Sequence, residues 1–212
     1  DGKKITNDVF WNTAEGMPLY SQGGGIFRYP DPDTGRLRYY WYGVRYAEAV
    51  RYREDPSVTY PACTFEAVTC YSSDDLINWY YEGDVLTREE VDRYGRAGWV
   101  GRMGVAYLEA WNQYVLVVQH DNGVLFALSH TPNGRFTWHR RITMEKIIGT
   151  PNTGDQTVFV DEDTRKPYLI YSYGRGRNRI YVSEIGIRDG QVDLLDCTQV
   201  FKGAGREGNC LF

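Results

Sequence analysis

The chain has 212 residues, a formal net charge of −4 and 15% aromatic residues, among them 18 tyrosines. This length suits one domain with a substantial core, and the aromatic content with short alternating runs favours an all-β fold. The acidic balance argues against a nucleic-acid surface, which needs a basic face. No stretch approaches ~18 consecutive apolar residues, so no membrane span is expected.

Three stretches of the chain repeat one plan, and a fourth begins at its end. Each has a polar residue, an apolar strand that closes on an aromatic ring, a turn, and a second, often Tyr-rich, strand. The strand pairs are 21–27 with 38–44, 101–107 with 113–120, and 154–159 with 167–174; the fourth start is 206–212. The closing aromatics of the later units recur about every fifty residues, a period typical of β-propeller blades.

Two further strands follow in each unit. Segments 71–83, 127–141 and 180–196 each have a strand, a turn with Asp or Asn, and a second strand. Each unit therefore supplies about four strands, which is one blade. In the first unit, residues Tyr46 to Thr69 intervene and are expected to form a long loop over one face. Only Arg88 to Tyr94 has a helical pattern.

The repeat count predicts a single propeller domain over residues 1–212 that is incomplete. Three blades and the first strand of a fourth cannot close a ring, because the strand edges would stay bare. We therefore expect the remainder of its own polypeptide to complete the propeller.

Blade geometry indicates where functional side chains gather. Inner strands begin at the pocket face, and second strands return to it. The polar residues at these places are Gln22, Arg102, Asp155 and Glu207 on inner strands, with His120 and Tyr173 among those on second strands. Such polar groups suit sugar hydroxyls, and aromatic rings suit sugar faces. His120 either touches a sugar hydroxyl or satisfies a backbone carbonyl.

Asp155 and Glu207 form a candidate pair for glycoside hydrolysis. That reaction needs a protonated carboxylic acid for the leaving oxygen and a second group that activates water. A neighbouring negative charge raises the pKa of an acid, so Asp155 would be the neighbour and Glu207 the proton donor. Alternatively, Asp155 caps a turn and Glu207 is a solvated residue at the start of a strand.

Several motifs resemble glycoside hydrolase family 43. The run DQTVFVDEDTRKPYLIYSY is similar to the family's central motif, and REGNCLF to the motif that carries its general acid. The runs MPLYSQGGGIFRY, RYYWYG and CYSSDDLINWYYEGDVL resemble its exo-β-1,3-galactanase-like branch. The resemblance implies a five-bladed propeller and an inverting, usually exo-acting, glycosidase. It also implies that Glu207 is the general acid and that Asp155 tunes and orients it.

The sequence departs from the family pattern in three places. Most members have an Asp where this chain has Gln22; in the galactanase-like branch a later Gln is assigned as base, and that region lies beyond Phe212. Val44 and Gly101 stand where this branch often has Glu. These losses put galactan specificity in doubt and leave open terminal arabinofuranose as well as galactose. They also leave open a catalytically inactive, carbohydrate-binding propeller.

The remaining expectations concern cofactors, thiols and location. No CxxC pair or zinc spacing is present, so no cofactor or metal is expected, and the sequence does not support a structural calcium. Cys63 and Cys70 either form a disulfide or are free thiols. The chain starts at Asp1 without an apolar secretory segment, as after removal of a signal peptide or trimming. We expect an exported protein: periplasmic, cell-surface or extracellular.

Overall fold

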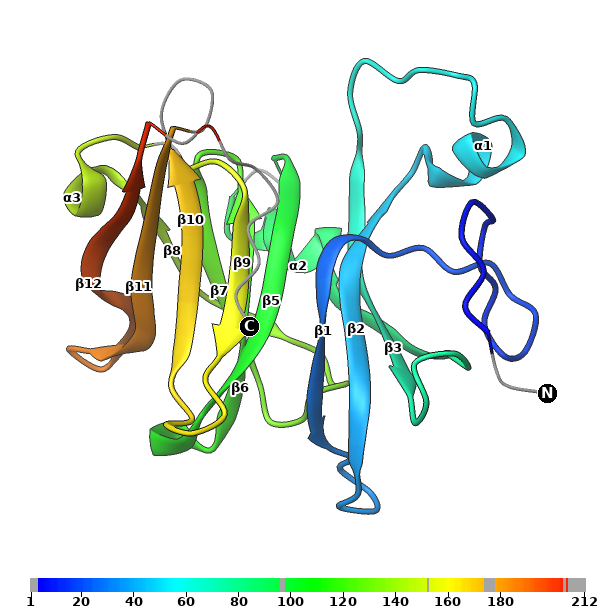
Figure 1. Ribbon diagram of the computed structural model, residues 1–212, viewed down its shortest axis with the longest axis horizontal. Helices are drawn as coiled ribbons and strands as arrows, with labels where there is room; N and C mark the ends of the chain where they lie inside the picture. Colours follow the sequence, from blue (N-terminus) through cyan, green and yellow to red (C-terminus); the bar gives the residue numbers. More distant parts are fainter. Residues whose placement is uncertain (1–3, 96–97, 152, 174–177, 204, 206–212) are drawn as a thin grey trace.

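The computed structural model describes residues 4–95, 98–151, 153–173, 178–203 and 205, and shows three four-stranded antiparallel sheets (Figure 1). In each sheet the strand order follows the chain. The first sheet contains β1 (Gln22–Pro30), β2 (Leu37–Tyr46), β3 (Phe65–Ser73) and β4 (Tyr80–Thr87). The second contains β5 (Val100–Leu108), β6 (Gln113–His120), β7 (Gly123–Ser129) and β8 (Thr137–Thr143). The third contains β9 (Gln156–Val160), β10 (Pro167–Tyr173), β11 (Arg179–Arg188) and β12 (Gln191–Lys202).

Short helical segments lie only in the connections of the described chain. They are α1 (Ala49–Glu54), α2 (Arg88–Arg93), α3 (Glu145–Ile148) and a 3-10 turn at Glu109–Trp111. The helical pattern predicted at Arg88 to Tyr94 is confirmed by α2. Its N-terminus is capped by Thr87, whose hydroxyl accepts a hydrogen bond from the Glu90 N–H at 3.3 Å.

The three predicted units are confirmed as three sheets, with one correction to the first. The long loop predicted from Tyr46 to Thr69 is shorter, because β3 already begins at Phe65. Residues 47–64 form the insertion, which includes α1 and stands at the end of the molecule where β1 and β5 begin (Figure 1). The strand was missed because CTFEAVT mixes polar and apolar residues and does not alternate cleanly. The predicted fourth start, 206–212, lies outside the described residues.

The glycine run at the start of β1 permits a close approach of two backbones. A Cβ atom on Gly24 would lie 1.6 Å from the carbonyl oxygen of Tyr42 on β2. The register between β1 and β2 shifts between Gln22 and Gly25 at this point. Only glycine fits here, so the run shapes the strand rather than binding a phosphate.

The core lies between the sheets, which pack face to face. One cluster of buried side chains joins the first and second sheets, and another joins the second and third. Three tyrosines of the first sheet also reach the second unit. Their hydroxyls donate to main-chain oxygens: Tyr29 to Val105 (2.6 Å), Tyr42 to Pro132 (2.6 Å) and Tyr46 to Val100 (2.5 Å). Burial raises the pKa of all three phenols, so they stay neutral donors.

The described cysteines are free thiols. Cys70 is buried in the core, whereas Cys63 and Cys197 are exposed. Of the two alternatives for Cys63 and Cys70, the structure therefore has the free thiols. Within the described ranges, no cluster of His, Cys, Asp and Glu could hold a metal ion, and no helix is long and apolar enough to cross a membrane.

Candidate active site

The first strand of each sheet (β1, β5 or β9) begins near Arg102. A Cβ atom on Gly23 of β1 would lie 4.0 Å from the Cα of Arg102 on β5. From β9, the side-chain amide of Gln156 donates to the carbonyl oxygen of Arg102 at 3.3 Å. Residues from all three sheets, far apart in the sequence, therefore meet at one end of the molecule.

Arg102 and Asp155, both predicted site residues, contact each other there. The guanidinium Nη2 of Arg102 lies 3.6 Å from Oδ2 of Asp155. Their side chains are 43% and 22% exposed, so the pair is partly solvated and contributes little to stability. Both groups remain accessible to a polar ligand. Two predicted site residues from different sheets therefore meet here, whereas the convergence of Asp155 with Glu207 stays a prediction.

A network that the sequence did not reveal holds this pair in place. Gln119, buried at the end of β6, donates from Nε2 to the carbonyl oxygen of Gly154 at 2.7 Å. Its Oε1 accepts from the Arg102 N–H at 3.4 Å. On the other side, the N–H of Ser172 donates to the carbonyl oxygen of Asp155 at 3.0 Å. The main chain around Asp155 is therefore fixed by both neighbouring strands.

Gln156 is a residue that sequence analysis missed. It follows Asp155 in the sequence and is buried. Its Oε1 has no hydrogen-bond partner among the described residues. The signal that could have found Gln156 is a glutamine at the site end of an otherwise apolar strand, as Gln119 also is. Alone in a buried environment, such a side chain needs a polar partner.

Gln22 and Tyr173 lie at the strand ends that the sequence predicted. Gln22 is the first residue of β1, is exposed and pairs with Val44. Tyr173 is the last residue of β10, next to Ser172, and is partly buried. Their positions suit ligand contact, and their role as sugar-binding residues stays a prediction.

His120 packs between an arginine and a tryptophan of β8. It is buried, and its Nδ1 accepts a hydrogen bond from Nε of Arg141 at 2.9 Å. The same guanidinium donates to the His120 carbonyl oxygen at 3.1 Å, and the imidazole stands edge-on to the Trp138 ring. The described contacts of the ring are with Arg141 and Trp138, and the choice between the two alternatives for His120 stays a prediction.

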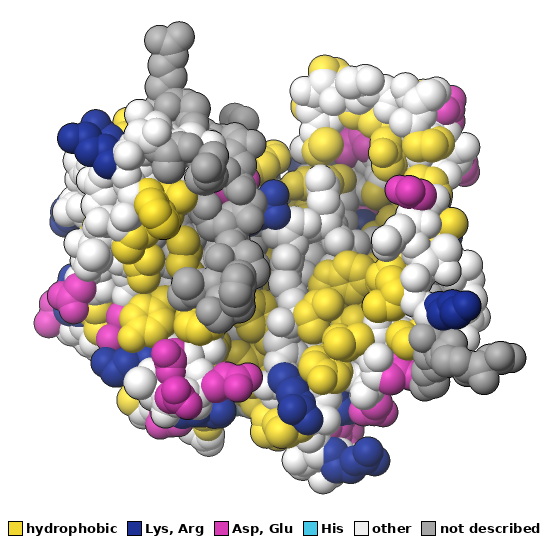
Figure 2. All heavy atoms as spheres, in the orientation of Figure 1, with side chains coloured by type: hydrophobic (Ala, Val, Ile, Leu, Met, Phe, Trp, Pro, Cys, Tyr) yellow, Lys and Arg dark blue, Asp and Glu magenta, His cyan; other side chains and the backbone are white. Residues whose placement is uncertain are grey.

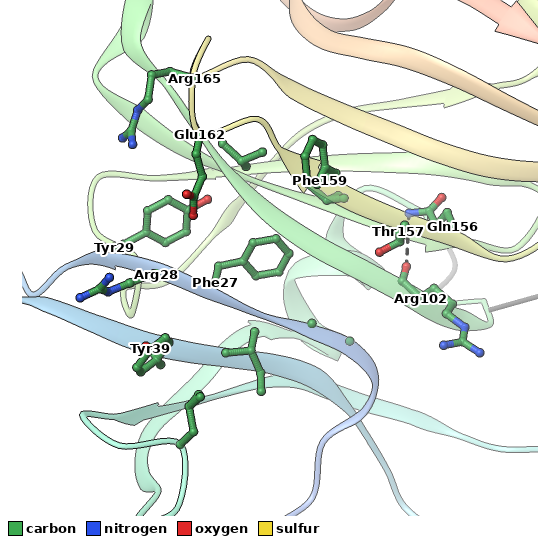
Figure 3. Close-up of a pocket in the computed structure, with 16 residues that line it drawn as sticks. Phe27, Arg28, Tyr29, Tyr39, Arg102, Gln156, Thr157, Phe159, Glu162 and Arg165 are labelled. Atoms are coloured by element: carbon green, nitrogen blue, oxygen red, sulfur yellow. Dashed lines mark hydrogen bonds between the residues drawn. The ribbon is translucent and has the colours of Figure 1, made fainter. Parts of the chain in front are cut away.

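A cavity of about 760 Å³ runs along β1 and β9 from this end of the molecule. Figure 3 shows Phe27 and Phe159 on its apolar walls, Arg102 and Gln156 at one end, and Glu162 with Arg165 toward the other. Figure 2 shows a notch between the first sheet and the other two, with hydrophobic side chains beside it. Glu207, the predicted general acid, lies outside the described residues.

The two positions that depart from the galactanase-like pattern carry no carboxylate, and both are covered by neighbouring side chains. Val44 is buried in the core between the first two sheets. At Gly101, a Cβ atom would lie 2.3 Å from the indole ring of Trp99. Any side chain at residue 101 would have to displace that ring.

No protein-family description and no curated protein sequence matches the chain. Similar solved structures include an exo-β-1,3-galactanase from Clostridium thermocellum, with 26% identity, a TM-score of 0.69, and coverage of 96% of this chain and 42% of that chain. An exo-β-1,3-galactanase from Phanerochaete chrysosporium, solved with β-1,3-galactotriose, has 23% identity, a TM-score of 0.71, and coverage of 95% and 43%. A GH43 β-1,3-galactosidase, solved with galactodeoxynojirimycin, has 20% identity, a TM-score of 0.73, and coverage of 98% and 70%.

The chain spans about two fifths of the length of the two galactanases. It shares its β-propeller-like fold with GH43 β-1,3-galactosidases and exo-β-1,3-galactanases, which confirms the resemblance to glycoside hydrolase family 43 found in the sequence motifs.

Proposed function

We propose that this chain is part of a family 43 glycosidase that releases terminal galactose from β-1,3-linked galactan, as in arabinogalactan. The observation that carries the proposal is the contact between Arg102 and Asp155 where the first strands converge. The similar structures support it, because they are galactanases and galactosidases, one of them solved with β-1,3-galactotriose. The same similarity favours galactose over arabinofuranose as the terminal sugar.

In this proposal the chemistry is single displacement with inversion. Glu207 donates a proton to the glycosidic oxygen as the bond to the anomeric carbon breaks. Water attacks the opposite face of that carbon and gives its proton to a base. Asp155 is held by Arg102 and by the main chain of Ser172. Its part in the proposal is to stand next to the acid. A negative charge there raises the pKa of a neighbouring carboxylic acid and keeps it protonated.

The rest of the proposed enzyme lies in the remainder of its polypeptide. We expect five blades in all, so that further sheets pack against the outer faces of the first and third sheets and complete the ring. The base that accepts the proton of water would come from that part, since Gln22 stands where most of the family has Asp. An exported location, without nucleic-acid partners, remains part of the proposal.

A carbohydrate-binding propeller without catalysis is the second candidate. Val44 and Gly101 favour it, because neither residue offers a carboxylate to a sugar where the galactanase-like branch often has Glu. Binding of β-1,3-galactotriose by calorimetry, with no galactose released over days, would support this candidate over the hydrolase.

The test compares Glu207→Gln and Asp155→Asn with the wild type in the full-length protein. The substrates are β-1,3-galactobiose and an aryl β-galactoside with a good leaving group. We expect Glu207→Gln to lower kcat on galactobiose by ~10²–10⁴-fold. On the aryl substrate the loss should be much smaller, because its leaving group needs little protonation. The control Asp163→Asn, in the exposed β9–β10 turn, should leave both rates unchanged.

Two results would contradict the proposal. If the Glu207→Gln variant keeps wild-type activity on galactobiose, Glu207 is not the general acid. If the first product seen by NMR has retained anomeric configuration, the single displacement is wrong. An aryl arabinofuranoside tested in parallel decides the terminal sugar.

A further inference from the structure

A recess of about 470 Å³ lies at the end of the first sheet that is opposite the candidate active site. It is lined by Asp31, Thr34, Arg36, Arg38, Asp74 and Tyr80. The first three of these residues belong to the turn between β1 and β2, and Figure 1 shows this turn at the far end of β1. The nine residues of β1 span about 26 Å at ~3.3 Å per residue, so the recess is separate from the contact between Arg102 and Asp155.

Arg38 of β2 is held in this recess by carboxylates. Its Nε donates to Oδ1 of Asp74 at 3.1 Å. Its Nη1 lies 3.6 Å from Oδ2 of Asp31 and 3.9 Å from Oε1 of Glu82. Glu82 in turn accepts a hydrogen bond at 2.9 Å from Nδ2 of Asn133, in the turn between β7 and β8. The guanidinium is therefore oriented before a ligand arrives, which lowers the entropy lost on binding, and its side chain stays 20% exposed.

The carboxylate of Asp31 is fixed by its own turn. Its Oδ1 accepts hydrogen bonds from the N–H and the hydroxyl of Thr34, at 2.8 and 2.9 Å, and from the N–H of Asp33 at 3.1 Å. These bonds, first those from Thr34, lower the pKa of Asp31, so the group is ionised at neutral pH. The recess therefore presents a fixed acceptor beside a fixed donor, a pair that suits two neighbouring hydroxyl groups.

The other groups of the recess point to a neutral ligand with an apolar face. Two carboxylates and two guanidinium groups line it, so charge selects neither an anion nor a cation. The ring of Tyr80, at the start of β4, is 42% exposed beside them. The buried hydroxyl of Tyr40, close enough to Asp31 for that charge to act on it, has no hydrogen-bond partner among the described residues. Such a hydroxyl calls for a further polar group, and an aromatic ring among polar groups suits a sugar.

We infer that this recess is a second binding site for the galactan main chain, outside the active site. The inference rests on the proposed function for the identity of its ligand. The C–H face of a galactose unit packs on Tyr80, and two of its hydroxyls bond to Asp31 and Arg38. A polysaccharide bound there stays with the enzyme after each terminal unit is released, which raises the effective concentration of chain ends. Galactobiose is too short to occupy both sites at once.

The test compares Tyr80→Ala, Tyr80→Phe and the control Leu37→Ala in the full-length protein, on β-1,3-galactan and on β-1,3-galactobiose. Leu37 is 53% exposed at the same end of the sheet, but it directly precedes Arg38 on β2 and so lies on the other face of that strand. We expect Tyr80→Ala to raise KM for galactan roughly three- to tenfold, the size of one aromatic contact, with kcat unchanged. Its galactobiose kinetics should be unchanged, and Tyr80→Phe and Leu37→Ala should match the wild type on both substrates.

Electrophoresis through gels that contain β-1,3-galactan separates this inference from the proposed function, because it measures binding without cleavage. If the wild type cleaves neither substrate but is retarded by galactan more than Tyr80→Ala, the hydrolase falls and the second site stands. Equal retardation of Tyr80→Ala and the wild type would overturn the second site. So would an equal rise in KM for galactobiose, or an equal loss of binding in Leu37→Ala.

Discussion

The side chain of Gln119 is the clearest test of how the site is held. Its Nε2 donates at 2.7 Å to the buried carbonyl oxygen of Gly154, and this bond ties the second sheet to the third. Leaving a buried acceptor without its donor costs about 1–3 kcal/mol. The hydroxyl of Thr153 also approaches this oxygen, at 3.3 Å, so we expect the lower part of that range. The 3.4 Å bond from the Arg102 N–H adds little.

Replacing Gln119 with Met keeps the size of the side chain and removes both bonds. We expect a loss of about 1–2 kcal/mol in the free energy of unfolding, measured by urea titration, and a Tm lower by about 2–8 °C. The matched control is Gln113→Met at the other, partly exposed end of β6, where a change within about 0.5 kcal/mol is expected. If both variants have the same stability, the reasoning that Gln119 links the sheets is refuted.

Two other predictions concern the first sheet. A Cβ atom on Gly24 would lie 1.6 Å from a main-chain oxygen of β2, so Gly24→Ala should cost about 3 kcal/mol or prevent folding. Gly35→Ala, at a φ of 69° in open space, should cost only about 1–2 kcal/mol; equal losses in urea titration would contradict the clash. Burial alone would raise the pKa of Asp84, but hydrogen bonds from Arg45 and Tyr81 outweigh it and lower that pKa. The stability that Asp84 contributes is therefore complete above its unfolded pKa of about 3.9 and lost as pH falls through the lower folded pKa. Urea titrations of wild type and Asp84→Asn should differ most at neutral pH and converge near pH 2; a constant difference would show that ionisation is not involved.

The order of the strands and the convergence of the site were predictable, because both depend on repeated local patterns. An apolar run, a turn and a second strand recur in each unit, and Arg102 and Asp155 both come shortly before the aromatic residue that closes the first strand of their unit. The starts of first strands in successive blades face the same axis, so the repeat predicted that these two residues lie at the same end of the molecule.

The supporting contacts were not predictable, because they cross between sheets. An apolar alternation shows which side of a strand is buried but not which neighbouring strand a side chain meets. Gln119 and Gln156 therefore looked like ordinary residues at strand ends, although they connect successive sheets. The contact of Trp99 with Gly101 depends on a shift in register near the start of β5, which no local pattern specifies.

The tyrosine hydroxyls that donate from the first sheet to the second unit affect how the protein unfolds. If the first sheet separated from the second, the carbonyl oxygens of Val105, Pro132 and Val100 would lose their partners together. Separation of the first and second sheets is therefore all-or-none, and amide hydrogens in β1, β2 and β5 should exchange with solvent in a single event. A fragment cut in the connection that carries α2 would not yield an independent folding unit, although each sheet is complete in sequence.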